Sequence, residues 1–312
     1  MSESVIIGVD HGYAAMKTAH FSFHTGLVAH EHEPYTLNNV LEYGGKYYVV
    51  GSGRQPLQKD KTQTEDYYLL TLAAIAKELE YRNAGTVADV HLAAGLPLTS
   101  FGRDKKAFRD YLCRDGKPVS FRFEGQDYAI TISKVSLYPQ GYAAVLTQSG
   151  LLNEPSIIVA DIGGWTVDLM RLDNRIPNAA TCRSLELGMI RCVDEIGEQV
   201  RRLFGLSLTA PQIESVLRGD SASMDERVRA VIHAQADKYV RGLLSTITES
   251  GLDVRAMPTV FLGGGAALMK RHGGAVEGLF RPFILDDVCL NAKGYERLVA
   301  QMSQGERSGR DG

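Results

Sequence analysis

Ile7-Gly8-Val9-Asp10-His11-Gly12 and Val159-Ala160-Asp161-Ile162-Gly163-Gly164 are the two stretches that decide the fold. Each is a short apolar run, typical of a buried strand, that ends in an aspartate and a glycine-bearing turn. Asp161 stands 151 positions after Asp10, and in each copy an apolar stretch and a second strand follow. Two similar halves of this size predict a duplicated α/β fold with a cleft between the halves.

The composition is that of a globular protein. The chain has 312 residues, of which 44% are apolar and 23% are charged, so it can bury a substantial core and is not disordered. Its formal net charge of −3 excludes a field that draws the whole chain onto DNA or an anionic membrane. We therefore expect no direct nucleic-acid binding and no membrane association.

The N-terminal residues and the cysteines indicate a cytoplasmic protein. Met1-Ser2-Glu3-Ser4 lacks the basic-then-apolar pattern of a secretion signal, and no apolar run approaches the length of a membrane span. The cysteines are scattered without a CxxC pair, which favours free thiols in a reducing compartment over a zinc site.

Hydrophobic periodicity predicts the elements around these two stretches. Helices are expected over residues 65–82, 100–112, 140–147, 189–204 and about 223–249. Strands are expected over residues 5–9, 26–30, 46–50, 90–94, 119–123, 128–132, 157–160 and 259–262, with residues 14–23 as the return of a hairpin. Residues 303–312 are polar and glycine-rich, and we expect this tail to be disordered.

The aspartate turns have the chemistry of a phosphate and metal site. Glycine lets the backbone N–H groups of a turn approach phosphate oxygens, and a carboxylate can bind Mg²⁺ through retained water molecules. Lys17 follows Gly12 by five residues, close enough on the returning strand to reach a β- or γ-phosphate. A single such turn is more simply a hairpin with an exposed aspartate, but the matched pair favours phosphate binding.

A third glycine turn lies near the C-terminus, at Phe261-Leu262-Gly263-Gly264-Gly265-Ala266-Ala267. This strand–glycine–helix junction suits a flat base or a ribose against the backbone. The alternative is a Rossmann dinucleotide turn, because Gly263 and Gly265 match its first two glycines and Asp286 follows about twenty residues on. Leu268 occupies the place of the third glycine, which disfavours that alternative, and the chain has no GxxxxGK[ST] P-loop.

Taken in order, these motifs resemble the actin–chaperone–sugar-kinase ATPase superfamily. Residues 7–12 with Lys17 resemble its first phosphate loop, residues 159–168 its second, residues 138–142 its first interdomain connection and residues 261–266 its adenosine loop. Within the superfamily the chain is most similar to the ParM/StbA group of plasmid-segregation actins. The similarity to that group lies in Gly95–Thr99, the basic helix around residues 105–109, Leu185–Met189 and Asn291–Tyr295.

The resemblance implies an actin-like (ribonuclease H-like) α/β fold of two domains. Domain I would be residues 1–154, completed by residues 286–302, and domain II would be residues 155–285. It also implies ATP or GTP with Mg²⁺ in the cleft, nucleotide hydrolysis, and polymerisation into a filament of identical chains. Such filaments move plasmid or mobile-element DNA through a separate DNA-binding adaptor of ParR type, in keeping with the lack of basic bias.

The same resemblance assigns the site residues. The catalytic residues would be Gln140, which orients the attacking water, with Asp10 and Asp161, which hold Mg²⁺ through water. The nucleotide would contact Gly12, Tyr13, Ala14, Lys17, Gly163, Gly164, Trp165, Thr166, Gly188, Gly263, Gly264, Gly265 and Ala266. Tyr13 stands where a small hydroxyl residue is common and Trp165 where Thr or Gly is common. Because the loops bind through backbone N–H groups, we still expect nucleotide binding.

Two other functions with the same cleft remain open. A sugar or acetate kinase would need an acceptor pocket with its own general base, for which the sequence offers no clear candidate. A chaperone-like or cell-division relative typically carries an extra substrate domain or an amphipathic membrane-targeting tail, and neither is evident in the sequence.

His30 and His32 could share one face of a strand, but without a second ligand cluster an exposed edge is the simpler interpretation. For His11, packing or a phosphate contact is expected rather than a general-base role.

Overall fold

The computed structural model describes residues 4–36, 38–53, 60–151, 153–220, 224–275 and 278–308. The contacts divide the chain into two compact units, residues 1–148 with 288–312 and residues 149–287. The domain limits expected from the sequence lie a few residues from these divisions, and they stay a prediction, as does the cleft between the halves.

The first unit is built on a mixed sheet of nine strands in the order β3-β2-β1-β7-β9-β8-β5-β6-β4. Strand β7 runs parallel to its neighbours β1 and β9, and the other neighbouring pairs are antiparallel. The strands are β1 (Val5–His11), β2 (Ala15–Lys17), β3 (Ser22–His24), β4 (Leu27–His30), β5 (Val40–Tyr43), β6 (Lys46–Val50), β7 (Val87–Leu96), β8 (Pro118–Phe123) and β9 (Gln126–Pro139).

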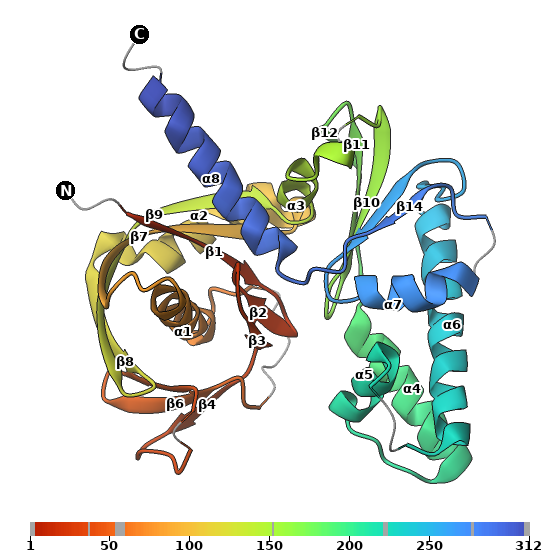
Figure 1. Cartoon of the computed structure of the whole chain (residues 1–312), viewed down its shortest axis with the longest axis horizontal. Helices are drawn as coiled ribbons and strands as arrows, with labels where there is room; N and C mark the ends of the chain where they lie inside the picture. Colours follow the sequence, from red (N-terminus) through yellow and green to blue (C-terminus); the bar gives the residue numbers. More distant parts are fainter. Residues whose placement is uncertain are drawn as a thin grey trace. The chain divides into compact units, whose positions relative to one another are not determined.

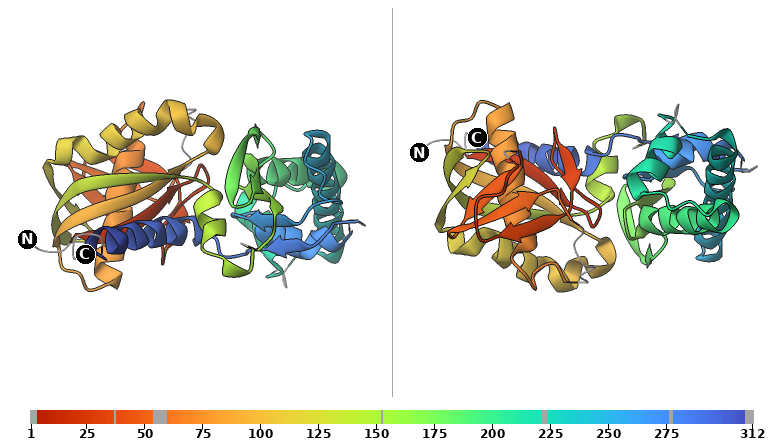
Figure 2. Two further views of the ribbon diagram at one scale, coloured as in Figure 1. Left: turned by 90° about the horizontal axis from the view of Figure 1, so that it is seen from above. Right: turned by 90° about the horizontal axis from the view of Figure 1, so that it is seen from below.

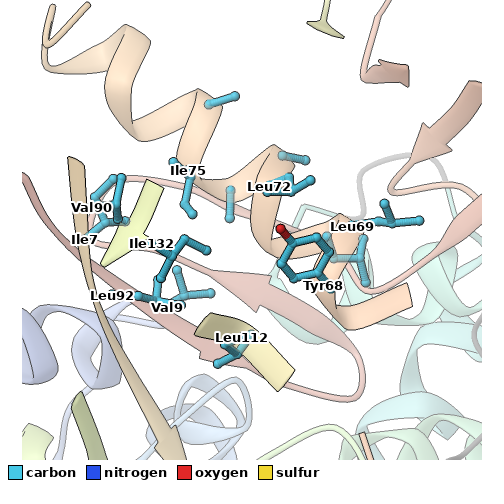
Figure 3. Close-up of a cluster of buried hydrophobic side chains, with 14 of the residues drawn as sticks. Ile7, Val9, Tyr68, Leu69, Leu72, Ile75, Val90, Leu92, Leu112 and Ile132 are labelled. Carbon is cyan, nitrogen blue, oxygen red and sulfur yellow. The ribbon is translucent and has the colours of Figure 1, made fainter. Parts of the chain in front are cut away.

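Helix α1 (Asp66–Tyr81) forms the centre of this unit, and the sheet curves around it (Figure 1). Its leucines and alanines favour a helix, and 12 of its 16 residues are buried. Leu69, Leu72 and Ile75 of α1 pack in one cluster with Ile7, Val9, Val90 and Leu92 of the sheet (Figure 3). This core holds the end of β1 in place.

Three further helices and one short 3-10 turn complete the first unit: α2 (Leu98–Cys113), α3 (Tyr142–Leu146), α8 (Leu290–Ser308) and η1 (Arg114–Gly116). A second 3-10 turn, η2 (Ser149–Leu151), begins the second unit. Figure 2 shows α8 lying along the sheet of the first unit, where it contacts β1 and β7. A Cβ at Gly8 would collide with the carbonyl oxygen of Ala292, and one at Gly95 with the ring of Tyr295. Glycine in β1 and β7 therefore allows this helix to pack close to the sheet.

The second unit has a mixed sheet of five strands in the order β12-β11-β10-β13-β14. The strands are β10 (Ser156–Ile162), β11 (Val167–Asp173), β12 (Ile176–Leu185), β13 (Thr259–Leu262) and β14 (Pro282–Ile284). The helices are α4 (Met189–Phe204), α5 (Ala210–Arg218), α6 (Glu226–Glu249) and α7 (Ala266–His272), followed by the 3-10 turn η3 (Gly273–Ala275). Buried residues of these helices form a second core with the apolar face of the sheet.

The two sheets share one arrangement, which confirms the duplicated α/β fold predicted from the aspartate repeat. In the run β3-β2-β1-β7-β9 the first two pairs are antiparallel and the next two are parallel. The run β12-β11-β10-β13-β14 has the same order of antiparallel and parallel pairs. The two aspartate stretches are the corresponding strands β1 and β10.

The structure corrects two of the expected elements. Residues 303–308 are not a disordered tail but the last turns of α8; residues 309–312 lie outside the described residues. Extending an existing helix is far easier than starting one, which outweighs the Gly and Ser content of this segment. The strand expected over residues 128–132 runs on to Pro139, because a register shift against β7 at Val90 and His91 accommodates the polar pair Ser133-Lys134.

The periodicity missed β5, β12, α5 and β14, whereas α7 is the helix expected after the third glycine turn. None of the described helices has both the length and the apolar content that crossing a membrane requires.

Candidate functional site

The first glycine loop places Lys17 directly opposite Asp10. Asp10 lies near the end of β1, and the antiparallel register pairs it with Lys17 on β2. Lys17 Nζ lies 3.1 Å from Asp10 Oδ2, and Asp10 is 3% exposed. The spacing read from the sequence thus produces a partly buried ion pair at the carboxyl end of a central strand.

Gln140 joins this pair from a strand two places away. It follows the end of β9, where its backbone N–H donates to the carbonyl oxygen of Leu96 on β7. Its side-chain Nε2 donates to Asp10 Oδ1 at 2.8 Å. The next residue, Gly141, donates its N–H to Asn291 Oδ1 at 2.9 Å, so a buried asparagine of α8 fixes the start of α3. The structure therefore brings together Asp10, Lys17 and Gln140, all predicted site residues.

The Asp10 carboxyl is held in its charged form. Burial raises its pKa, but the ammonium groups of Lys17 and Lys61 and the hydrogen bonds from Lys17 and Gln140 outweigh burial, so its pKa lies below the usual value. A carboxylate that stays ionised is suited to bind a hard cation through water.

The turn at residues 12–14 is fastened by a residue that the motif does not include. Gly12 N–H donates to the carbonyl oxygen of Asp10 at 3.1 Å. Thr25 donates its hydroxyl to the carbonyl oxygen of Gly12 at 2.7 Å and its N–H to that of Ala14 at 3.0 Å. Since both carbonyl oxygens accept from Thr25, this residue sets the direction of the loop's peptide groups.

His11 is a buried, neutral packing residue, as expected. Thr71 donates its hydroxyl proton to the carbonyl oxygen of Tyr67 at 2.6 Å, so it accepts from His11 Nε2 at 2.8 Å. Burial, and then the charge of Lys61, lower the pKa of His11 to about 3. The imidazole is therefore uncharged near neutral pH.

The second glycine loop repeats this geometry with the opposite charge across the strands. Asp161 lies near the end of β10, 8% exposed, and pairs in register with Asp168 on β11. Asp168 therefore takes the place in its sheet that Lys17 has in the other. It accepts hydrogen bonds from Thr166 at 3.1 Å and from Ser184 at 2.6 Å. Asp168 stands 151 positions after Lys17, as Asp161 does after Asp10. The repeat could therefore have identified Asp168 from the sequence as the residue opposite Asp161.

Gly188 closes the second loop. It is the N-terminal cap of α4, and its N–H donates to the carbonyl oxygen of Trp165 at 2.9 Å. The N–H groups of Met189 and Ile190 donate to Gly163 and Gly164 at 3.0 and 2.9 Å. A Cβ at Gly188 would collide with the carbonyl of Gly164. The loop residues 163–166 and Gly188, predicted separately, thus form one structure.

The third glycine loop packs against Asp161. Gly263 has a φ of +84°, and a Cβ there would collide with Asp161 Oδ1. The N–H of Gly265 donates to the carbonyl oxygen of Ile162 at 3.0 Å, and that of Ala266 to Gly263 at 3.1 Å. The two loops therefore meet at the carboxyl ends of the parallel strands β10 and β13, where ligands of open α/β sheets bind.

The described residues contain no group of three or more His, Cys, Asp or Glu side chains that could hold a metal ion. Asp10 and Asp161 each present a buried carboxylate at the end of a strand, but they belong to different units. Their joint role at one metal ion stays a prediction. All four cysteines are free thiols.

Comparisons with known proteins identify the fold. Residues 8–142 match the family model described as actin like proteins N terminal domain. No curated protein sequence matches the chain. Among solved structures, the archaeal actin homolog Ta0583 aligns with a TM-score of 0.77 at 19% identity, over 96% of this chain and 99% of that chain. Its complex with ADP aligns with a TM-score of 0.76.

Two ParM structures also align over nearly their whole length. A 15-stranded ParM filament from Clostridium botulinum has a TM-score of 0.74 at 18% identity, covering 96% of this chain and 99% of that chain. The apo psk41 ParM protein has a TM-score of 0.70 at 17% identity, covering 97% and 99%. The likeness that the sequence motifs indicated is thereby confirmed.

Proposed function

We propose that this chain, an actin-like protein by its fold and by the family match of its N-terminal residues, is a filament-forming nucleotide hydrolase. It would bind ATP or GTP with Mg²⁺, polymerise with the nucleotide bound, and segregate plasmid or mobile-element DNA in the cytoplasm. A DNA-binding adaptor of ParR type would connect the filament to the DNA, since the net charge of −3 gives the chain no general attraction to DNA.

The matched aspartate loops carry this proposal. In each sheet a buried aspartate ends the corresponding strand and is followed by a glycine turn. Support comes from the archaeal homolog solved with ADP and from the ParM filament, which share this fold at low identity.

The chemistry of each loop suits a magnesium nucleotide. Asp10 and Asp161 would each offer the carboxylate oxygens that Mg²⁺ prefers, and Lys17 would offer a cation for the phosphates. At the third loop Gly264 is exposed, and a Cβ there would meet no atom within 4 Å, so a base or ribose would have room beside the backbone at this residue. Bound Mg²⁺ would neutralise charge on the transferring phosphoryl group.

In this proposal Gln140 would orient the attacking water. Its amide donates to Asp10 through Nε2, and the carbonyl oxygen of the same amide can accept a hydrogen bond from the attacking water. A neutral amide is no strong base, so its contribution is orientation, which is what phosphoryl transfer requires.

Light scattering and pelleting with and without nucleotide test the proposal. We expect polymer with Mg²⁺ and ATP or GTP, phosphate release that accompanies assembly, and none without nucleotide. DNA alone should not pellet with the filaments. A folded chain that stays monomeric with both nucleotides would contradict the proposal, and transfer of phosphate to a small-molecule acceptor would indicate a kinase instead.

A further inference from the structure

Lys61 is a buried cation that lies against the first glycine loop and that no motif includes. It is 8% exposed. Its ammonium donates to the carbonyl oxygen of His11 and lies 4.9 Å from the ring centroid of Tyr13 and 5.4 Å from that of Tyr67. It therefore contacts the residues on both sides of Gly12.

The contacts of Lys61 hold its ammonium near this loop. A carbonyl oxygen and the faces of two aromatic rings replace part of the water that a buried ammonium loses. Lys61 and Lys17 both act on the Asp10 carboxylate. The Lys17 ammonium lies 3.1 Å from Asp10 Oδ2 and the Lys61 ammonium on the carbonyl oxygen of His11, so two ammonium groups lie at this one loop, which suits the approach of an anion.

Tyr13 leaves the first loop without the short hydroxyl that could donate to a phosphate, a role that a second cation could take. A small hydroxyl at this position would donate a short hydrogen bond to a phosphate, and a tyrosine places its hydroxyl far from the backbone. In this chain the Tyr13 ring instead lies under the Lys61 ammonium. The cation–π contact holds the ammonium beside a loop that has no short side-chain hydroxyl at residue 13.

We propose that Lys61 is a second phosphate-binding residue of the first loop, which acts with Lys17 on the phosphate chain of a nucleoside triphosphate. This inference rests on the proposed function, because it names a residue of the same nucleotide site. An ammonium acts on phosphate as a point charge, so its effect should grow with the number of phosphates and fall with salt.

The test compares Lys61→Gln with Lys77→Gln in the full chain. Lys77 is a matched control, since its ammonium also lies over a ring, 5.1 Å from the centroid of Phe123, and pairs with Glu124 at 3.6 Å. Binding of adenosine, ADP and ATP, and of guanosine, GDP and GTP, with Mg²⁺ is measured at low and high salt. We expect Lys61→Gln to weaken triphosphate binding by about tenfold or more, diphosphate binding less, and nucleoside binding not at all. Lys77→Gln should bind all of them as the wild type does.

Two further variants complete the test, one for folding and one for the missing small hydroxyl. Lys61→Met removes the charge but keeps an apolar stem, so it replaces Lys61→Gln if that variant melts early. Tyr13→Ser in the Lys61→Gln background restores the small hydroxyl and should recover part of the triphosphate affinity.

The two proposals fail in different ways. If folded Lys61 variants bind triphosphate as the wild type does, or lose nucleoside and triphosphate affinity equally, Lys61 is not a phosphate ligand. If the wild type itself binds no nucleotide, the proposed function is wrong as well.

Discussion

Gly263 lies against Asp161 near the end of β10, where a Cβ would collide with the carboxylate. We predict that Gly263→Ala lowers the free energy of unfolding by about 1–3 kcal/mol, because its φ of +84° is strained for alanine and the Cβ would collide with Asp161. It should also weaken nucleotide binding, since the carboxylate must move. Thermal melting and nucleotide titration measure both effects.

Gly264 is the matched control for this prediction. It is exposed, and a Cβ there would meet no atom within 4 Å. Gly264→Ala should melt as the wild type does. Equal stability of the two variants would show that the contact between Gly263 and Asp161 is not tight.

Gln140→Ala should slow hydrolysis while nucleotide stays bound. The variant loses the hydrogen bond to Asp10 and the amide oxygen that would orient water. We expect phosphate release under single-turnover conditions to slow by about 100-fold, as for other residues that position a nucleophile, with the dissociation constant changed little. A single-turnover rate equal to that of the wild type would remove Gln140 from the chemistry.

His11 should make the fold sensitive to acid. Its pKa in the folded chain is about 3, against 6.5 for an ordinary histidine. Between these pH values the unfolded chain binds a proton at this residue and the folded chain does not. The contribution of His11 to the free energy of unfolding is therefore fully present above pH 6.5 and is lost as the pH falls towards 3. The contribution of this one group is at most about 1.4 kcal/mol per pH unit.

Urea unfolding between pH 7 and pH 4 tests this prediction. His11→Gln, which keeps a donor for Thr71, should show a shallower loss of stability with falling pH than the wild type. His24→Gln, at an exposed position of β3, serves as the control and should keep the wild-type slope. Parallel pH curves for the wild type and His11→Gln would contradict the prediction.

Helix α8 depends on glycine in the strands beneath it. A Cβ at Gly95 of β7 would collide with the buried ring of Tyr295. We predict that Gly95→Ala destabilises the chain by about 1–3 kcal/mol, the usual cost of overpacking a core. Thermal and chemical denaturation provide the measurement.

Gly102 of α2 offers the opposite expectation for the same chemical change. No atom lies within 4 Å of a Cβ built there, and alanine in a helix is favoured over glycine by about 0.5–1 kcal/mol. Gly102→Ala should therefore be as stable as the wild type or more so. If Gly95→Ala is equally well tolerated, α8 does not pack as closely as described.

At the scale of elements, periodicity predicts the long amphipathic and buried segments and misses the short ones. The helix of residues 65–82 is confirmed as Asp66–Tyr81, and that of residues 189–204 as Met189–Phe204. The short elements β5, α5 and β14 were not predicted because a few residues carry too little periodic signal. The ten-residue strand β12 was not predicted either, because none of its residues is buried and its sequence shows no apolar alternation. The end of α8 was not predicted because its Gly and Ser residues disfavour a helix. The helix forms there because it is an extension of one that begins earlier in the chain.

At the scale of the whole chain, the repeat predicts the duplication. For Lys17 the sequence predicts a place on the returning strand near the first loop, and the antiparallel register of β1 and β2 sets it opposite Asp10. The bond between Gln140 and Asp10 could not be predicted in the same way, because it depends on the strand order β1-β7-β9. Lys61 carries no local motif and reaches His11 from 50 positions away. Such contacts depend on tertiary structure rather than on local sequence.

Isothermal titration calorimetry with Mg²⁺ and ATP or GTP tests the central claim most directly, with Asp161→Ala measured in parallel. We predict that the wild type releases or absorbs heat with at least one of the two triphosphates, that Mg²⁺ strengthens the binding, and that Asp161→Ala loses this strengthening. A folded wild-type chain that gives no heat with either nucleotide, or an Asp161→Ala variant with unchanged Mg²⁺ dependence, would contradict it.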